Sequence, residues 1–293
     1  MPLRYLLAIA ALALAGPALD RPVVDADPPL WVARDGDTTV YLFGSVHWLK
    51  QGTGWFDEAV KTAFDASDTL VLESVAPPRA EAEAEMNELG TIADGPSLPE
   101  RLPSDARPRL AAALRSVGYA PDAFDHVEPW LAATSLSVLP LQKAGYSASY
   151  GVEAVLTAAA RDAGKPIVAL ESTRTQLGYF DTMPQADQVA MLLRVLGSID
   201  AVVDSNDRTV AAWARGDVAG LRAIVADDLR QSSQSFADAI VDRRNARWAD
   251  WLAGRMATPG TVFVAVGSAH LVGPGDLLTR LRERGVEVRR IDY

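Results

Sequence analysis

The sequence predicts an α/β fold with a mixed central sheet, built from two related halves that each contain a β-α-β unit, with a large helical insertion. Three observations lead to this prediction. Short β-prone apolar runs alternate with amphipathic runs towards both ends of the chain, as in β-α-β units. The apolar runs 41–47 and 264–270 both finish in Gly-Ser-x-His. Residues from about 76 to 165 instead follow a mostly helical pattern.

The first half is expected to form a β-hairpin, an amphipathic helix and a buried strand. Asp35-Gly36-Asp37 provides the turn of the hairpin, and the buried strand ends in Glu73. Strand, helix and strand at this spacing predict the first β-α-β unit. The expected ranges are 30–34 and 38–43 for the hairpin, 56–64 for the helix and 69–73 for the strand.

In the middle and at the end of the chain, helices are expected to alternate with three strands, over 167–171, 261–266 and 286–291, the first two of them buried. A strand over 167–171 again ends in a carboxylate, Glu171, so Glu73 and Glu171 share one context. A strand over 261–266, the second Gly-Ser-x-His turn, a helix and a last strand predict the closing β-α-β unit. The expected helices are 106–117, 130–144, 151–163, 185–196, 209–214, 236–256 and 276–284, and the last strand is 286–291.

The first residues predict a secretory signal peptide over 1–18. A charged start, an apolar stretch of about ten residues and small residues near its end are the signature, with cleavage after Ala15 or Ala18. A retained anchor is the alternative, although the stretch is short for a spanning helix, which needs about 20 residues. We therefore expect a single mature domain over 19–293, in the periplasm or secreted, that meets the membrane only through this segment.

Composition excludes several classes of protein. The formal net charge of −10 argues against a nucleic-acid partner, since binding to phosphate backbones requires clustered Lys and Arg. The chain has no cysteine, so a disulfide, a thiol nucleophile and a thiolate metal site are all excluded. Any metal ion must be held by His, carboxylate or water.

Histidines and carboxylates follow the predicted strands at their carboxyl ends. His47 and His270 occupy matched turns, and Glu73 and Glu171 end two strands. Carboxyl ends of parallel strands meet at one sheet edge, and two histidines with a carboxylate form a common catalytic metal site. Each Glu is equally compatible with a helix cap or a salt bridge. The third histidine, His126, lacks this context and is expected to be structural or exposed.

One further pair of polar residues is a candidate for the site. Arg244 and Asn245 lie on the long predicted helix, where an Arg pair is usually solvated but also suits an oxyanion contact. The sequence contains no GxSxG, HExxH, GxxxxGK[ST] or GxGxxG motif, so a serine hydrolase is only weakly supported.

These motifs together resemble the TraB/GumN family, which is related to Tiki metalloproteases and, more distantly, to erythromycin-esterase-like and ChaN-like proteins. The resemblance runs from about residue 31 to residue 290. It is carried by YLFGSVH, LVLES, YGVE, GKPIVALE, RN with a following Trp, and FVAVGSAH.

The resemblance implies an α/β core with helical insertions and a metal-dependent hydrolytic site. Its paired GxxH histidines fall on His47 and His270, and its Glu after the second core strand falls on Glu73. Many relatives carry Gly-Ile-Asp where this chain has Gly151-Val152-Glu153, so Glu153 keeps the acid on a longer side chain.

The leading hypothesis is a secreted metal-dependent hydrolase, specifically a peptidase acting on a peptide or protein. Mn²⁺, Co²⁺ or Zn²⁺ would be held by His47, His270 and Glu73. Glu171 or Glu153 would act as general base, and Arg244 or Asn245 would stabilise the oxyanion. A periplasmic protein that sequesters a peptide or haem without turnover is the alternative, and an inert envelope scaffold is a third.

Overall fold

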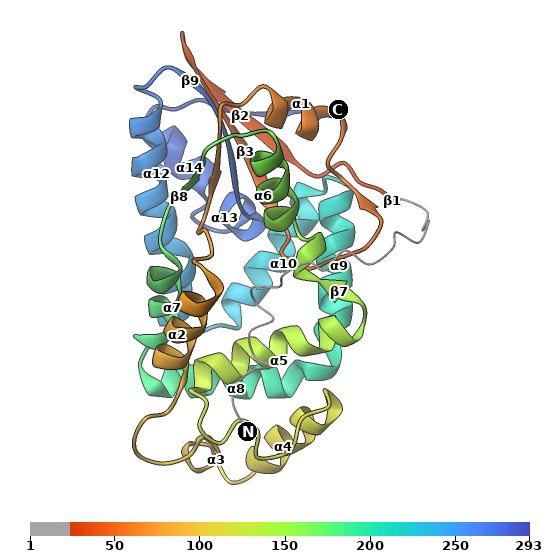
Figure 1. Ribbon diagram of the computed structural model, residues 1–293, viewed down its shortest axis with the longest axis vertical. Coiled ribbons are helices and arrows are strands. Elements are labelled where there is room, and N and C mark those ends of the chain that lie inside the picture. Colours follow the sequence, from red (N-terminus) through yellow and green to blue (C-terminus); the bar gives the residue numbers. More distant parts are fainter. Residues whose placement is uncertain (1–23) are drawn as a thin grey trace.

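A computed structural model describes residues 24–293 (Figure 1). The predicted signal peptide lies outside the described residues. Within 24–293, no helix combines the length and the apolar character that crossing a membrane requires.

The fold is organised around a mixed six-stranded sheet, as predicted. The strand order is β10-β2-β3-β9-β6-β8. β2 runs antiparallel to both neighbours, and the ladders β3–β9, β9–β6 and β6–β8 are parallel. Four neighbouring strands therefore end at the same edge. The strands are β2 (Leu30–Arg34), β3 (Thr38–Ser45), β6 (Thr69–Leu72), β8 (Ile167–Ala169), β9 (Gly260–Gly267) and β10 (Val288–Ile291).

Helices cover both faces of this sheet. α1 (Glu58–Asp65) and α6 (Val152–Asp162) pack on one face, and α13 (Ser268–Val272) and α14 (Leu277–Glu283) lie on the other (Figure 1). Their apolar residues and the strands form one large hydrophobic cluster. The hairpin and both predicted β-α-β connections are confirmed, because β3, β6, β9 and β10 all run in one direction.

Most of the other helices form a second layer beyond the carboxyl edge of the sheet, whereas α12 (Arg243–Arg255) runs beside the sheet and joins its hydrophobic cluster (Figure 1). A separate hydrophobic cluster joins α2 to α5 and α8, so this layer extends past the predicted limit of 165. The helices of this layer are α2 (Arg79–Gly90), α3 (Leu98–Arg101), α4 (Arg107–Ser116), α5 (Pro129–Lys143), α7 (Thr173–Asp181), α8 (Gln185–Ser198), α9 (Val202–Ala214), α10 (Val218–Arg230) and α11 (Gln234–Ala237). Short strands β4 (Leu49–Lys50) and β7 (Tyr146–Ser147) pair beside the sheet, and β1 (Val24–Asp25) pairs with β5 (Thr53–Gly54).

Two local predictions were wrong. The strand over 167–171 is not buried, because β8 is the edge strand and Val168 is 37% exposed. Its apolar sequence resembles that of a central strand, but only one side of it finds a partner. The helix predicted over 236–256 is not uniform either, since a π-helical turn at Asp238–Asp242 separates α11 from α12.

Candidate functional site

The candidate site lies at the shared carboxyl edge of the parallel strands. Ser45 pairs with Gly267 where β3 and β9 end, so the two Gly-Ser-x-His turns are adjacent. His47 follows β3 and His270 follows β9, while Glu73 comes directly after β6. The prediction that these side chains meet at one edge is confirmed.

Gly267 lies at the centre of this convergence. A Cβ built on it would stand 3.2 Å from Oε1 of Glu73, 3.6 Å from Cδ2 of His270 and 3.8 Å from Nε2 of His47. Gly267 also donates its N–H to Oε1 of Glu73 at 2.6 Å. A methyl group at this position would touch all three groups, and only its contact with Glu73 would be tighter than ordinary van der Waals contact.

His47, His270 and Glu73, with the residues that bind them, are called the strand-end cluster. His47 is its exposed histidine and pairs with Glu153. Nδ1 of His47 lies 2.9 Å from Oε1 of Glu153, and 56% of the His47 side chain is exposed. The extra methylene of Glu, relative to Asp, thus does not prevent the contact. Glu153 raises the pKa of His47 to about 9, against the opposing effect of partial burial. The ring presents its other nitrogen, Nε2, to the centre of the cluster.

Gly151 makes this pair possible. A Cβ at Gly151 would stand 2.1 Å from the backbone oxygen of His47, so only glycine lets the start of α6 pass so close to the turn. The N–H of Val152 then donates to the oxygen of Val46 at 3.2 Å. The tripeptide Gly151-Val152-Glu153 therefore anchors α6 to the turn and delivers the carboxylate to His47.

His270 is buried, and its two nitrogens are both occupied. Nδ1 lies 2.7 Å from Oδ1 of Asn245, and Nε2 lies 3.1 Å from Nη1 of Arg244. Nδ2 of Asn245 donates to the oxygen of Gly275 at 3.0 Å, which sets the amide orientation. Oδ1 of Asn245 must then accept a hydrogen bond from the Nδ1–H of His270, and Nε2 of His270 must accept one from Arg244. Burial lowers the pKa of His270 to about 4, so the ring is neutral at physiological pH.

Arg244 joins the two strand-end carboxylates. Its Nε donates to Oε1 of Glu171 at 2.8 Å, its Nη2 donates to Oε2 of Glu73, and its Nη1 also donates to the oxygen of Ile240 at 3.1 Å. Ile240 lies in the π-helical turn before α12. Burial disfavours ionisation of Glu73, but Arg244, the nearby histidines and the Gly267 N–H together hold its pKa at about 2.

Three site residues had no role assigned from sequence. Nε2 of Gln176 donates to Oε2 of Glu73 at 3.0 Å, while the hydroxyl of Tyr179 and Nη2 of Arg247 donate to Oε2 of Glu171 at 3.1 and 2.9 Å. Helical spacing could have indicated them, because residues three apart lie on the same face of a helix. Arg247 lies three residues after Arg244, and Tyr179 lies three after Gln176. No helix was predicted over 173–181, so this spacing carried no weight there.

The structure places Arg244 and Asn245 differently from the predicted oxyanion role. Both are buried, at 4% and 0% exposure, and their polar atoms bind His270 and the carboxylates. Glu171 is similarly enclosed by Arg244, Arg247 and Tyr179. These residues are positioned to order the site, and the exposed groups that could meet a ligand are His47 and Arg247.

Hydrogen bonds within the site already occupy most of the atoms predicted to bind a metal ion. His47 and His270 each have Nδ1 next to an acceptor, as ligating histidines do, so the donor types suit a metal. However, both oxygens of Glu73 and Nε2 of His270 already accept from N–H groups. Within residues 24–293, no three His, Asp or Glu side chains are placed to hold a metal ion. As the residues lie, they do not fit a three-ligand ion, and the metal stays a prediction.

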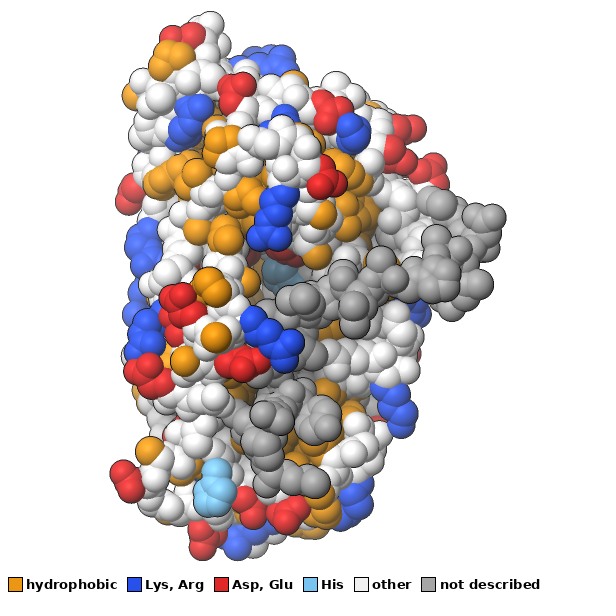
Figure 2. All heavy atoms as spheres, in the orientation of Figure 1, with side chains coloured by type: hydrophobic (Ala, Val, Ile, Leu, Met, Phe, Trp, Pro, Cys, Tyr) orange, Lys and Arg blue, Asp and Glu red, His pale blue; other side chains and the backbone are white. Residues whose placement is uncertain are grey.

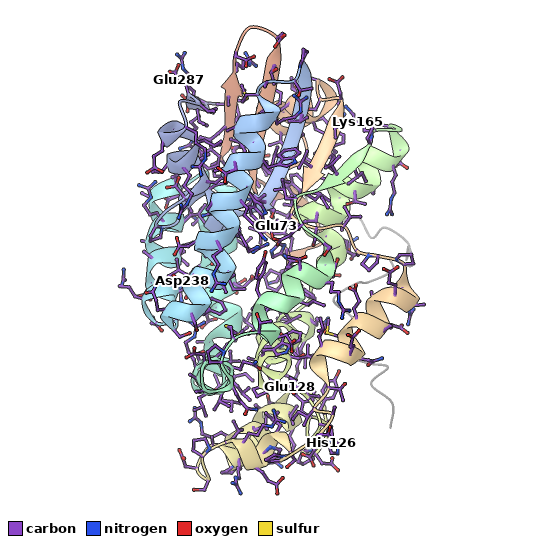
Figure 3. All side chains as sticks on the ribbon, turned by 90° about the vertical axis from the view of Figure 1, so that its left-hand side faces the viewer. Glu73, His126, Glu128, Lys165, Asp238 and Glu287 are labelled. Atoms are coloured by element: carbon purple, nitrogen blue, oxygen red, sulfur yellow. The ribbon has the colours of Figure 1, made fainter. Side chains whose placement is uncertain are left out.

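The cluster lies near the middle of the molecule. Figure 3 shows Glu73 between the sheet and the helical layer, whereas His126 lies at the far end of the helical layer. Figure 2 shows a histidine side chain in a hollow at mid-height, and of the two Gly-Ser-x-His histidines only His47 is exposed. The site is thus open to solvent through His47.

Comparison with known proteins agrees with the resemblance found in the sequence. No solved structure matches the chain. The uncharacterized protein YbaP of Escherichia coli K12 is 25% identical over 269 residues, which covers 87% of this chain and 92% of YbaP. YbaP of Shigella flexneri matches with the same identity and coverage. The model of the TraB/PrgY/gumN family matches residues 29–290, and the chain therefore belongs to that family.

Proposed function

We propose that the strand-end cluster is the reacting site of a hydrolase that cleaves an amide bond in a peptide or protein. The observation that carries this proposal is the pairing of an exposed imidazole, His47, with Glu153 beside a buried polar network. A histidine whose Nδ1 faces a carboxylate keeps its Nε2 for proton exchange, as in acid–base dyads of hydrolases, and here Nε2 faces the centre of the cluster beside Gly267. Family membership supports the site but not the reaction, since the matching YbaP proteins are uncharacterized.

In this proposal His47 moves the protons. In the neutral form of the ring, which predominates only above its pKa of about 9, Nε2 takes a proton from water as the water oxygen attacks the carbonyl carbon, and later returns that proton to the leaving amine. Glu153 holds the ring and stabilises its charged form. Arg247, whose side chain is 51% exposed, has N–H groups available to a carbonyl oxygen or a substrate carboxylate.

The buried residues position this machinery. Glu73, His270 and Asn245 are held by Arg244 and the backbone, so the neighbouring ends of β3 and β9 keep a fixed geometry around Gly267. Such fixed placement is what acid–base catalysis requires of the groups around the reacting carbon. No step of the proposal needs these residues to contact the substrate.

A peptide-library digestion read by mass spectrometry tests the proposal. The wild-type chain should cleave a subset of peptides, His47→Ala should lose that cleavage, and His126→Ala should retain it. His126 is a matched control because it is the other exposed histidine and lies far from Glu73 (Figure 3). Equal cleavage by wild type and His47→Ala would reject the assignment. Peptides retained at one per protein and recovered intact would instead support the sequestering protein.

The proposed location is the periplasm or the exterior, reached through the predicted signal peptide over 1–18. Its support is the charged and apolar N-terminal sequence. N-terminal sequencing of the chain purified from the periplasmic fraction should start near residue 16 or 19. Recovery of the intact N-terminus in the membrane fraction would indicate a retained anchor.

A further inference from the structure

The guanidinium of Arg244 occupies the donor atoms that a metal ion would need. It contacts Nε2 of His270 at 3.1 Å and Oε2 of Glu73, which are two of the three predicted ligand groups. It also donates to Glu171 at 2.8 Å. A single cationic side chain thus binds three groups that lie within the cluster.

The direction of these hydrogen bonds is fixed by the chemistry of the side chains. Arginine has no acceptor, so Nε2 of His270 offers its lone pair to Arg244. Asn245 fixes the tautomer that makes this lone pair available. The same tautomer would suit a metal ion, which means that the ion and Arg244 would compete for one lone pair.

Arg244 is held firmly in this position. Its guanidinium carbon lies 4.5 Å from the centroid of Trp248, and the Trp248 and His270 rings lie 4.6 Å apart. Trp248 is 1% exposed. A planar cation that stacks on an indole and makes paired hydrogen bonds loses much of this interaction if it moves. A divalent ion entering beside it would also meet a like charge in a buried environment.

We propose that Arg244 serves as a built-in cation that takes the place of a divalent metal ion at His270 and Glu73 and excludes it. Wild-type protein then holds no stoichiometric metal at these residues, and removal of the guanidinium frees a site for one ion. The test measures metal binding alone, so its outcome does not depend on whether the protein cleaves peptides.

The test titrates Co²⁺ and Zn²⁺ separately into the full chain and its variants. Visible absorption reports bound Co²⁺, and elemental analysis after desalting reports bound Zn²⁺. Arg244→Ala should bind one ion about tenfold or more tightly than wild type, a typical strength for coupling between competing groups. Arg247→Ala is the matched control, because Arg247 lies one turn away and contacts Glu171 but neither His270 nor Glu73. The double variant Arg244→Ala/His270→Ala should lose the new binding.

Two results would overturn the inference. One is a stoichiometric ion in wild type that His270→Ala removes, which would show that Arg244 yields to a metal. The other is a folded Arg244→Ala that binds metal no better than Arg247→Ala. If circular dichroism shows Arg244→Ala to be unfolded, Arg244→Gln keeps a hydrogen-bond donor without the charge. That variant should gain thermal stability on adding Zn²⁺, and a wild-type-like lack of response in the folded variant would also count against the inference.

Discussion

The two Gly-Ser-x-His turns have nearly identical sequences and opposite environments. The His47 side chain is 56% exposed and faces a carboxylate, whereas the His270 side chain is 5% exposed and lies between an amide and a guanidinium. The turns also touch, because the hydroxyl of Ser268 donates to the oxygen of Ser45 at 2.9 Å. A Cβ at Gly44 would stand 2.9 Å from that hydroxyl, so Gly44 permits the contact.

The difference arises from the segment into which each strand leads. After β9 the chain enters α13 directly, which turns His270 inward against α12. After β3 the chain instead continues to β4, which leaves His47 outside the packed core. The same four residues thus supply one histidine for contact with a ligand and one for internal order. Their environments, and not the motif, assign the roles.

The largest expected loss in the free energy of unfolding comes from replacing Arg244, which lies among the buried groups around His270. Arg244→Ala leaves Glu73 and Glu171 without their shared cation, and unpaired buried charges typically cost about 3–5 kcal/mol. Urea unfolding at neutral pH measures the loss. Arg247→Ala, which removes a half-exposed partner of Glu171, should cost about 1 kcal/mol or less. Equal losses in the two variants would show that burial does not separate the two arginines.

Replacing the histidines themselves should separate stability from activity. His270→Ala removes a buried ring and leaves Asn245 and Arg244 unsatisfied, so the free energy of unfolding should fall by about 2–4 kcal/mol. His47→Ala should change it by about 1 kcal/mol at most while abolishing the proposed cleavage. The comparison fails if His47→Ala proves the more destabilising of the two.

Two glycines that approach the turns, Gly151 beside His47 and Gly267 at the centre of the cluster, should also differ when replaced. Gly151→Ala places a methyl group against the backbone of His47 at 2.1 Å, which side-chain motion cannot relieve, so a loss of about 1–3 kcal/mol is expected. Gly267→Ala meets only side-chain atoms, at 3.2–3.8 Å. Its stability should be nearly unchanged while the proposed activity falls, because the methyl group enters the centre of the cluster. Thermal unfolding with a parallel cleavage assay checks both variants.

The smallest effects concern pH. The raised pKa of His47 means that its pairing with Glu153 adds stability below the unfolded-state value of about 6.5 and loses it as pH rises through about 9. The lowered pKa of His270 acts oppositely: stability falls as pH drops from about 6.5 towards 4, because the unfolded chain binds the proton first. Imidazole NMR titrations should show the two rings titrating on opposite sides of 6.5. In Glu153→Gln, only the titration of His47 should move markedly.

Sequence reasoning located the site better than it described its connections. Alternating strand and helix patterns placed His47, His270 and Glu73 at one edge, since parallel strands end together. Periodicity could not show that β8 lies at the edge, because apolar sequence does not reveal a missing neighbour. It also could not show that Arg244 reaches three partners, since that depends on the phase of α12. The π-helical turn at Asp238–Asp242 resets this phase and has no simple sequence signature.

Helix α7 gives the molecule a mechanical property that neither hydrophobic cluster has alone. Gln176 and Tyr179 bind the strand-end carboxylates, while Leu177 and Phe180 on the same helix pack into the helical cluster. Movement of the helical layer away from the sheet must therefore displace Glu73 and Glu171 or break their hydrogen bonds to Gln176 and Tyr179. Amide hydrogen exchange along α7 would report that opening directly, and its rate would set how often the site can admit or release a large ligand.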